Sequence, residues 1–178
     1  MTYYDDIYER AADNYGLITS ADAREMGIPV VELGKLYKRG RLNRVGHGIY
    51  RIFHYTPTAL DGYADAVALV GQGAYLFGES VLAMHNLAPT NPATIKVATP
   101  NIVRKNLPPY IAIIMRNSNE QIALYEGIPS QSVANAIRTC MKTMMSDRLL
   151  GAVSEARKQG LINEKEARWL KKEIGSSH

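Results

Sequence analysis

The 178-residue chain lacks the marks of several protein classes. Its single cysteine, Cys140, cannot form an internal disulfide, and a chain of this length can bury enough apolar surface to fold without one. Cys140 lies in an apolar, helix-like run, which favours a small buried side chain over a catalytic thiol. The longest apolar runs, such as 64–70, are too short to cross a bilayer, and the acidic, aromatic first residues do not resemble a signal peptide. These absences predict a cytoplasmic protein of one domain or two small ones.

Motifs for catalysis, metals and cofactors are also missing. The four histidines are scattered, and the sequence contains no HExxH or CxxC pattern. Gly71-Gln72-Gly73 lacks the rest of a phosphate-binding fingerprint and is predicted to be a turn, and Gly78-Glu79-Ser80 lacks the second glycine of a nucleophile elbow. His85 follows an apolar stretch, which favours a half-buried, hydrogen-bonded histidine over a catalytic one. We therefore predict no metal, no cofactor and no enzymatic activity.

Acidic residues are absent from one segment, residues 34–52, which carries six Lys or Arg and a net charge of +6. The preceding segment, 1–33, has two basic and seven acidic residues, a net charge of −5. The remainder, 53–178, has a net charge of +3, which brings the whole chain to +4. Clustering of positive charge, rather than its total, is the electrostatic signature of a nucleic-acid-binding surface.

The first 52 residues carry signals for three helices followed by a β-hairpin. Apolar residues recur at helical spacing over 3–15, and Thr19 with Asp22 resembles a capping box that starts a short helix ending at Gly27. A third helix is predicted from Pro29 to Gly40. The period then changes to two over 42–52, with a tight turn at Gly46-His47-Gly48. This order predicts a winged helix-turn-helix whose third helix enters the major groove and whose hairpin is the wing.

The candidate DNA-binding residues lie on the third helix and the wing. Val31 can contact a thymine methyl group and Lys35 can reach guanine O6 and N7. Arg44 and His47, at the wing, can enter the minor groove. The remaining cations are expected to contact phosphates, which position the protein without reading sequence. The full predicted set is Val31, Lys35, Lys38, Arg39, Arg41, Arg44, His47 and Arg51.

The rest of the chain predicts a small mixed α/β domain, so that the whole protein is of the α+β class. We place the winged helix-turn-helix in 1–56 and the second domain in 57–174, and we leave 175–178 out of functional argument as a tail that an expression tag can produce. Helices are predicted over 58–69, 80–86, 128–142, 147–159 and 163–174. Strands are predicted over 75–77, 94–98, 111–115 and 121–126.

The segment GLITSADAREMGIPVVELGKLYKRGRLNRVGHGIYRI, residues 16–52, resembles the N-terminal domain of the AbiEi family of antitoxins and transcriptional repressors from type IV, abortive-infection toxin–antitoxin pairs. The shared features include the Leu33-x-x-Leu36 spacing and the Lys-Arg-Gly-x-Leu step into Gly48-x-Tyr50. FGESVLAMHNL, residues 77–87, the strand end 97–100 and EGIP, residues 126–129, are similar to the family's second half. The resemblance extends over about residues 15–143. The chain departs from the family at Val30 and Val31, where members often carry basic residues.

This resemblance implies a repressor that binds inverted repeats in double-stranded DNA of its own operon promoter. It also implies an antitoxin that counteracts a partner nucleotidyltransferase-like toxin, with a role in phage resistance. A second hypothesis is a protein-interaction module whose C-terminal domain binds the toxin, with the N-terminal domain as scaffold. The basic pairs 104–105, 157–158 and 171–172 would then dock the toxin or its substrate, although an ordinary solvated helix face or loop is the favoured explanation of each pair. A third, a metal-dependent nuclease or nucleotidyl enzyme, needs clustered carboxylates, which the predicted strands 94–98 and 111–115 lack.

Overall fold

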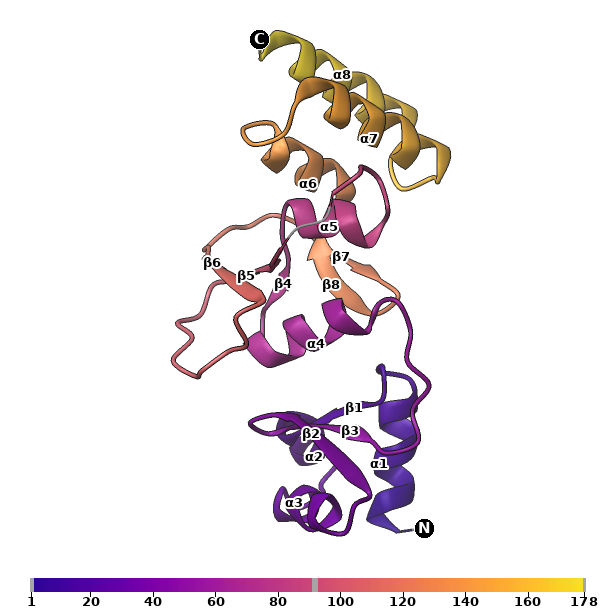
Figure 1. Ribbon diagram of the computed structural model, residues 1–178, viewed down its shortest axis with the longest axis vertical. Coiled ribbons are helices and arrows are strands. Elements are labelled where there is room, and N and C mark those ends of the chain that lie inside the picture. Colours follow the sequence, from indigo (N-terminus) through magenta and orange to yellow (C-terminus); the bar gives the residue numbers. More distant parts are fainter. Residues whose placement is uncertain (1, 91–92, 178) are drawn as a thin grey trace. The chain divides into compact units, whose positions relative to one another are not determined.

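The computed structural model describes residues 2–90 and 93–177 (Figure 1). The chain divides into two compact units, of which one ends at Leu69 and the other begins at Val70. Both units combine helices with a β-sheet, so the predicted α+β class is confirmed. None of the helices within the described residues is both long and apolar enough to span a bilayer.

The N-terminal unit alternates helices and strands around a three-stranded antiparallel sheet. Its sheet order is β1-β3-β2, so the first strand pairs with the last strand of the hairpin. This arrangement is consistent with the predicted winged helix-turn-helix, although β1 was not predicted. The elements are α1 (Tyr3–Ala12), β1 (Leu17–Thr19), α2 (Ser20–Glu25), α3 (Val31–Lys38), β2 (Leu42–Gly46), β3 (Ile49–Ile52) and α4 (Asp61–Val70).

The first helix ends earlier than its apolar pattern predicts. The Gly16 amide donates to the Ala11 carbonyl at 2.8 Å, and Tyr15 and Gly16 take positive φ values of 57° and 71°. These conformations end the helix and turn the chain into β1. The aliphatic face of α1 then packs with the apolar residues of α2, α3 and the sheet into one buried core, formed by Ile7, Ala11, Ile18, Ala23, Ile28, Leu33, Leu36, Leu42 and Ile52.

The C-terminal unit is built on a five-stranded mixed sheet in the order β6-β5-β4-β8-β7. The β5–β6 and β4–β8 pairs are parallel, and the β4–β5 and β7–β8 pairs are antiparallel. The strands are β4 (Tyr75–Leu76), β5 (Ile95–Thr99), β6 (Ile111–Met115), β7 (Ile122–Tyr125) and β8 (Ile128–Gln131).

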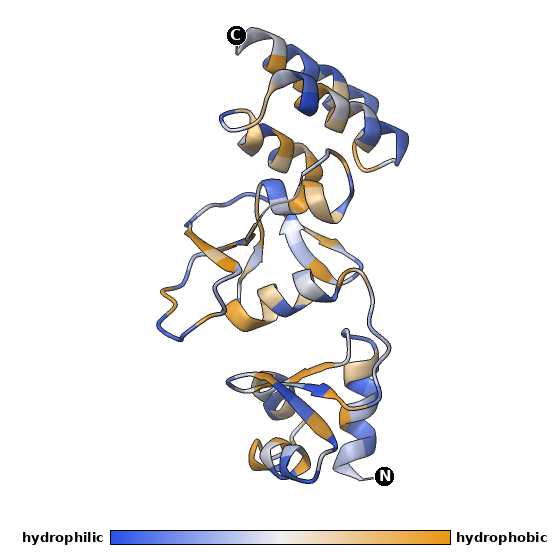
Figure 2. Cartoon of the chain, in the orientation of Figure 1, coloured by the Kyte–Doolittle hydropathy of each residue, from blue (hydrophilic) through white to orange (hydrophobic). Residues whose placement is uncertain are grey.

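Four helices complete this unit: α5 (Glu79–Met84), α6 (Val133–Cys140), α7 (Ser146–Lys158) and α8 (Glu164–Ser176). Neighbours α6, α7 and α8 pack against one another, and α5 packs against α6. Both α7 and α8 mix hydrophilic and hydrophobic residues along their length (Figure 2). Leu149 of α7 and Leu170 of α8 are fully buried because they face the neighbouring helices, whereas Leu150 and Trp169 are exposed.

The prediction of a helix over 128–142 was wrong at its start. Glu126 and Gly127 take positive φ values of 48° and 80° and form a tight turn, so residues 128–131 pair back onto β7 as strand β8. The helix begins only at Val133, where the Ser132 hydroxyl accepts from the Asn135 amide at 3.2 Å. Proline before serine is compatible with a helix start, which is why the local pattern misled.

Two boundaries also differ from the sequence-based ones. The division between the compact units lies after Leu69, so all of α4 except its last residue belongs with the N-terminal unit, whereas the sequence placed the start of the second domain at residue 57. The separate roles assigned to the two domains stay predictions. The tail expected from residue 175 begins within α8, which runs to Ser176, and its last residue, 178, lies outside the described residues.

Cys140 and His85 are both buried in the C-terminal unit. Cys140 has 1% of its surface exposed, and burial raises the pKa of its thiol to about 12, which confirms the interpretation as a small buried side chain. His85 is 6% exposed, and burial lowers its pKa to about 4. Contrary to the expectation of a hydrogen-bonded histidine, its Nδ1 atom has no hydrogen-bond partner among the described residues. Its ring instead lies edge-on to Tyr125, with centroids 4.1 Å apart.

Candidate nucleic-acid interface

Helix α3 is positioned by the turn that precedes it. The Thr19 hydroxyl accepts from the Asp22 amide at 3.0 Å and the Asp22 carboxylate accepts from the Thr19 amide at 2.9 Å, so the predicted capping box is present at the start of α2. Gly27 ends the turn with φ of 72°, and the Ile28 amide donates to the Ala23 carbonyl at 2.8 Å. The chain then enters α3 at Val31, two residues later than the predicted start at Pro29.

The two faces of α3 differ sharply. Leu33 and Leu36 face the core, whereas Val31 is 62% exposed at the first turn. Lys35 is exposed, but its Nζ atom lies 2.9 Å from Glu32 Oε1 in an ion pair one turn apart. Lys38 and Arg39, at the end of the helix, are exposed and form no ion pair within the described residues. The free positive charge of α3 therefore lies at its C-terminal end.

The wing is a short hairpin whose tip is held in place. Strands β2 and β3 pair with Arg44 opposite Tyr50 and Gly46 opposite Ile49, so Val45 forms a bulge. The turn residue Gly48 has φ of 69°, and its carbonyl accepts from the Ser20 amide at 2.8 Å. Arg44 and His47 are exposed, which leaves both side chains accessible on an anchored wing.

Arg41 follows α3 in the chain and lies against the start of α1. Its guanidinium carbon is 5.0 Å from the centre of the Tyr4 ring, a cation–π geometry. Its charge helps to lower the pKa of Asp5, after the larger effects of hydrogen bonds from Thr2. Arg41 and Arg39 line a surface hollow of about 460 Å³ between α1 and α3. The guanidinium group of Arg41 therefore interacts with residues at the start of α1.

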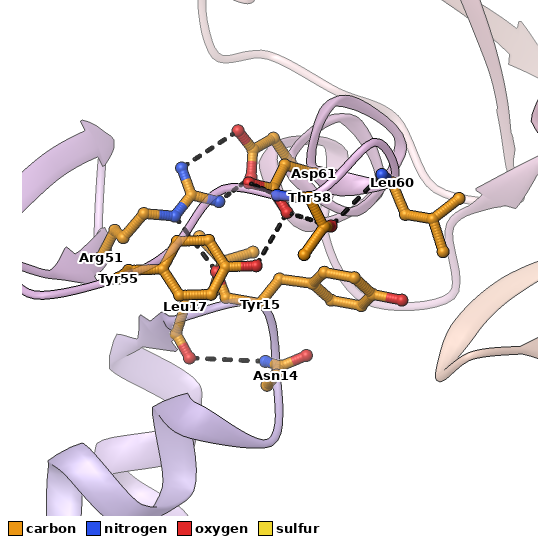
Figure 3. Close-up of polar contacts among 9 residues, drawn as sticks. Asn14, Tyr15, Leu17, Arg51, Tyr55, Thr58, Leu60 and Asp61 are labelled. Atoms are coloured by element: carbon orange, nitrogen blue, oxygen red, sulfur yellow. Dashed lines mark hydrogen bonds and ion pairs between the residues drawn. The ribbon is translucent and has the colours of Figure 1, made fainter.

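Arg51 differs from the expectation of a free phosphate-binding cation (Figure 3). Its guanidinium forms a double hydrogen bond to the Asp65 carboxylate on α4, and its Nε atom donates to the Tyr15 carbonyl at 3.1 Å. The guanidinium carbon also lies 5.2 Å from the centre of the Tyr55 ring. Both charged side chains are about four-fifths buried, at 19% and 18% exposure. Arg51 is thus an anchor between β3 and α4.

A second polar cluster next to Arg51 fixes the start of α4 (Figure 3). The Tyr55 hydroxyl donates to the Asp61 carboxylate at 2.8 Å, and the Thr58 hydroxyl donates to it at 2.7 Å. Burial acts to raise the pKa of Asp61, but the hydrogen bonds from Thr58 and Tyr55 outweigh it, so this pKa is lowered. Burial, with the bond to Asp61, raises the pKa of Tyr55.

Most of the predicted DNA-binding residues therefore lie on two neighbouring elements of the structure. One of them, Arg51, is not available to bind phosphate. Val31, Lys35, Lys38 and Arg39 lie on or directly after α3, and Arg44 and His47 lie on the wing that follows. Arg41 turns toward α1, and Arg51 is engaged with Asp65. The sequence offered no local signal for this last pair, because its partners are fourteen residues apart on different elements.

Comparison with protein families gives a match for this part of the chain. Residues 5–52 match the family of AbiEi antitoxin transcriptional regulators. This match confirms the family resemblance predicted from the sequence, and it covers α1 through β3. The resemblance of residues 77–143 to the second half of AbiEi proteins lies outside the matched segment and stays a prediction.

Two further comparisons are less informative. No curated protein matches the chain significantly in sequence. Among solved structures, the crystal structure of the RV2827C protein from Mycobacterium tuberculosis aligns with a TM-score of 0.43 and 13% sequence identity. The alignment covers 96% of this chain and 81% of that protein.

Proposed function

We propose that the protein is a DNA-binding autorepressor whose α3 and wing bind inverted repeats in its own operon promoter. The observation that carries this proposal is the placement of Lys38, Arg39 and Arg44, which are exposed and form no ion pair within the described residues. Lys38 ends α3, Arg39 follows it directly, and Arg44 lies on the wing, so all three belong to the helix and hairpin region that a winged helix-turn-helix presents to a duplex. Free cations on such elements release counterions when they contact phosphates.

Fewer side chains are available for sequence-specific contacts to the DNA bases than for contacts to the phosphates. Val31, exposed at the first turn of α3, offers an apolar contact for a thymine methyl group. Lys35 must leave Glu32 before it can reach a guanine, so its contribution is reduced by the cost of breaking that pair. His47 lies at the wing tip. Either His47 or Arg44 could insert into a narrow minor groove of the DNA.

Band-shift titrations with the protein's own upstream DNA test this proposal. We expect Arg39→Gln to weaken binding more than Lys35→Gln, because Arg39 forms no ion pair and Lys35 does. Arg51→Gln is the contrasting variant, since we expect it to act by destabilising the N-terminal unit rather than by removing a DNA contact. Equal affinity of the wild type and Arg39→Gln for the upstream DNA would refute the assigned interface.

The antitoxin part of the proposal rests on the AbiEi match. We propose that the protein counteracts a nucleotidyltransferase-like toxin encoded beside it. Co-expression of the neighbouring gene with the full chain, and with an Arg39→Gln and Arg44→Gln variant, tests this in growing cells. We expect both forms to relieve growth arrest if antitoxicity is independent of DNA binding. Growth arrest that persists with the wild-type chain would overturn the toxin assignment.

A further inference from the structure

A second basic site lies in the C-terminal unit, far in sequence from the wing. It is a surface hollow of about 530 Å³ lined by Arg116, Glu120, Asn135, Arg138, Thr139 and Lys142. Four of these residues lie on α6 or just after it, at spacings of three and four that put them on one helix face. The other two come from the segment that joins β6 to β7.

The carboxylate of Glu120, which lines the hollow and is here called its floor, is held by hydrogen bonds. Glu120 accepts from the Tyr75 hydroxyl at 3.0 Å and from the Gln131 amide at 3.2 Å, and its side chain is only 10% exposed. Burial, with the bond to Glu120, raises the pKa of Tyr75 to about 12, so its hydroxyl remains a donor. Gln131 is itself 1% exposed and accepts from the Gly78 amide at 2.7 Å. This network fixes the floor before any ligand arrives.

The charge around the hollow is mostly uncompensated. Arg116 lies 3.5 Å from Glu120 in an ion pair, and its guanidinium is also 5.0 Å from the centre of the Phe77 ring. Arg138 and Lys142 are exposed and form no ion pair among the described residues. With three cations and one carboxylate, the hollow carries a net charge of +2. Arg138 is held in place by Trp169, whose ring centre lies 5.3 Å from its guanidinium carbon.

We propose that this hollow binds the phosphate groups of a small polyphosphate-bearing molecule. Arg138 and Lys142 supply the uncompensated charge, and the guanidinium group forms two parallel hydrogen bonds to one phosphate. The Asn135 amide has two donor hydrogens, of which one points to Glu120 at 3.5 Å, so the other is available to a ligand oxygen. A volume of about 530 Å³ suits a mononucleotide-sized ligand.

Linked phosphate groups of this kind occur both in free pyrophosphate and in nucleoside di- and triphosphates, so either could be the ligand of the hollow. Titration calorimetry of the full chain with pyrophosphate, ATP and GTP separates them, because added affinity of a nucleotide over pyrophosphate measures contacts to the base and sugar. Trp169, the single tryptophan, lies against Arg138 and supplies a fluorescence signal for the same titrations. We expect at least one of these probes to bind and to change this signal.

The decisive variant is Arg138→Gln with Lys142→Gln. Both side chains are exposed, so their replacement leaves the buried core unchanged. We expect binding to weaken roughly tenfold or more, since charge-assisted contacts to phosphate are lost. The matched control is Arg157→Gln with Lys158→Gln, an exposed basic pair of α7 that lies outside the hollow and removes the same charge. It should bind the probe as the wild type does.

Three results would overturn the proposal. One is that neither pyrophosphate nor either nucleotide binds the wild-type chain at millimolar concentration. Another is that both double variants weaken binding equally, which would mean that net charge alone is responsible. The last is that a single-stranded oligonucleotide without a terminal phosphate displaces the probe and binds more tightly, which would assign the hollow to a nucleic-acid strand. Upstream DNA binding by the Arg138 and Lys142 variant, measured in parallel, separates failure here from failure of the repressor assignment.

Discussion

Acidification should destabilise the C-terminal unit through His85. The folded protein keeps this imidazole neutral, since burial lowers its pKa from the ordinary 6.5 to about 4. In the unfolded chain the same group takes up a proton as the pH falls through 6.5. The unfolded state therefore binds more protons between pH 6.5 and pH 4, and the free energy of unfolding falls as the pH falls through this range.

The size of the effect follows from the two pKa values. Each pH unit within the interval costs about 1.4 kcal/mol, so lowering the pH from 7 to 5 should remove about 2 kcal/mol of stability through this residue. The full loss, reached at about pH 4, is roughly 3 kcal/mol. These values are large beside the 5–15 kcal/mol that is typical of whole domains, so roughly a fifth of the total or more depends on one imidazole.

Urea unfolding at pH 7 and pH 5, followed by the fluorescence of Trp169 in the same unit, measures this loss. His85→Gln removes the titrating group, so its unfolding free energy should fall by about 2 kcal/mol less than that of the wild type over the same interval. His54→Gln, which replaces an exposed histidine of the N-terminal unit, is the control and should keep the wild-type dependence. If the wild type and His85→Gln lose stability equally between the two pH values, the burial argument is wrong.

Further substitutions test the fold. Gly16→Ala should destabilise the N-terminal unit by about 1–2 kcal/mol in thermal melts, because φ is +71° and a Cβ atom there would clash with a tyrosine ring. Gly27→Ala, where φ is +72° but the space for a Cβ atom is open, should reduce the stability less. Ser132→Ala removes the cap of α6 and should cost about 1 kcal/mol in urea unfolding, and no loss would exclude the cap as a stabilising contact. Leu170→Ala empties a fully buried position and should cost about 2–5 kcal/mol, whereas Leu150→Ala, at 36% exposure, should cost clearly less; equal losses would contradict the observed packing.

Local signals explain which parts of the fold could be predicted. The capping box at Thr19 and the turn glycines at 27 and 48 act within a few residues, so α2, the approach to α3 and the wing follow from the sequence. Strand β8 could not be predicted in this way. Its pairing with β4 joins Leu76 to Ser130, and the local Ile-Pro-Ser sequence fits a helix start equally well.

The same distinction applies to the candidate sites. The basic segment was visible as a charge cluster, but whether each cation is free depends on partners elsewhere in the chain. Lys35 is paired by a neighbour one turn away, whereas Arg51 is paired across the fold by Asp65. The hollow beside α6 could have been suspected from polar residues at helical spacing over 135–142. Glu120, the carboxylate at its floor, comes from the segment between β6 and β7, so its position in the hollow could be recognised only from the structure.

The most direct test of the repressor assignment is the salt dependence of binding to the protein's own upstream double-stranded DNA. If Lys38, Arg39 and Arg44 each neutralise one phosphate, the logarithm of the association constant should fall against the logarithm of salt concentration with a slope of about −2.7 from these contacts. Replacing all three by glutamine should reduce the slope by that amount, while Arg157→Gln with Lys158→Gln should leave it unchanged. A triple variant that keeps both the wild-type affinity and the wild-type slope would contradict the proposal that α3 and the wing hold the DNA.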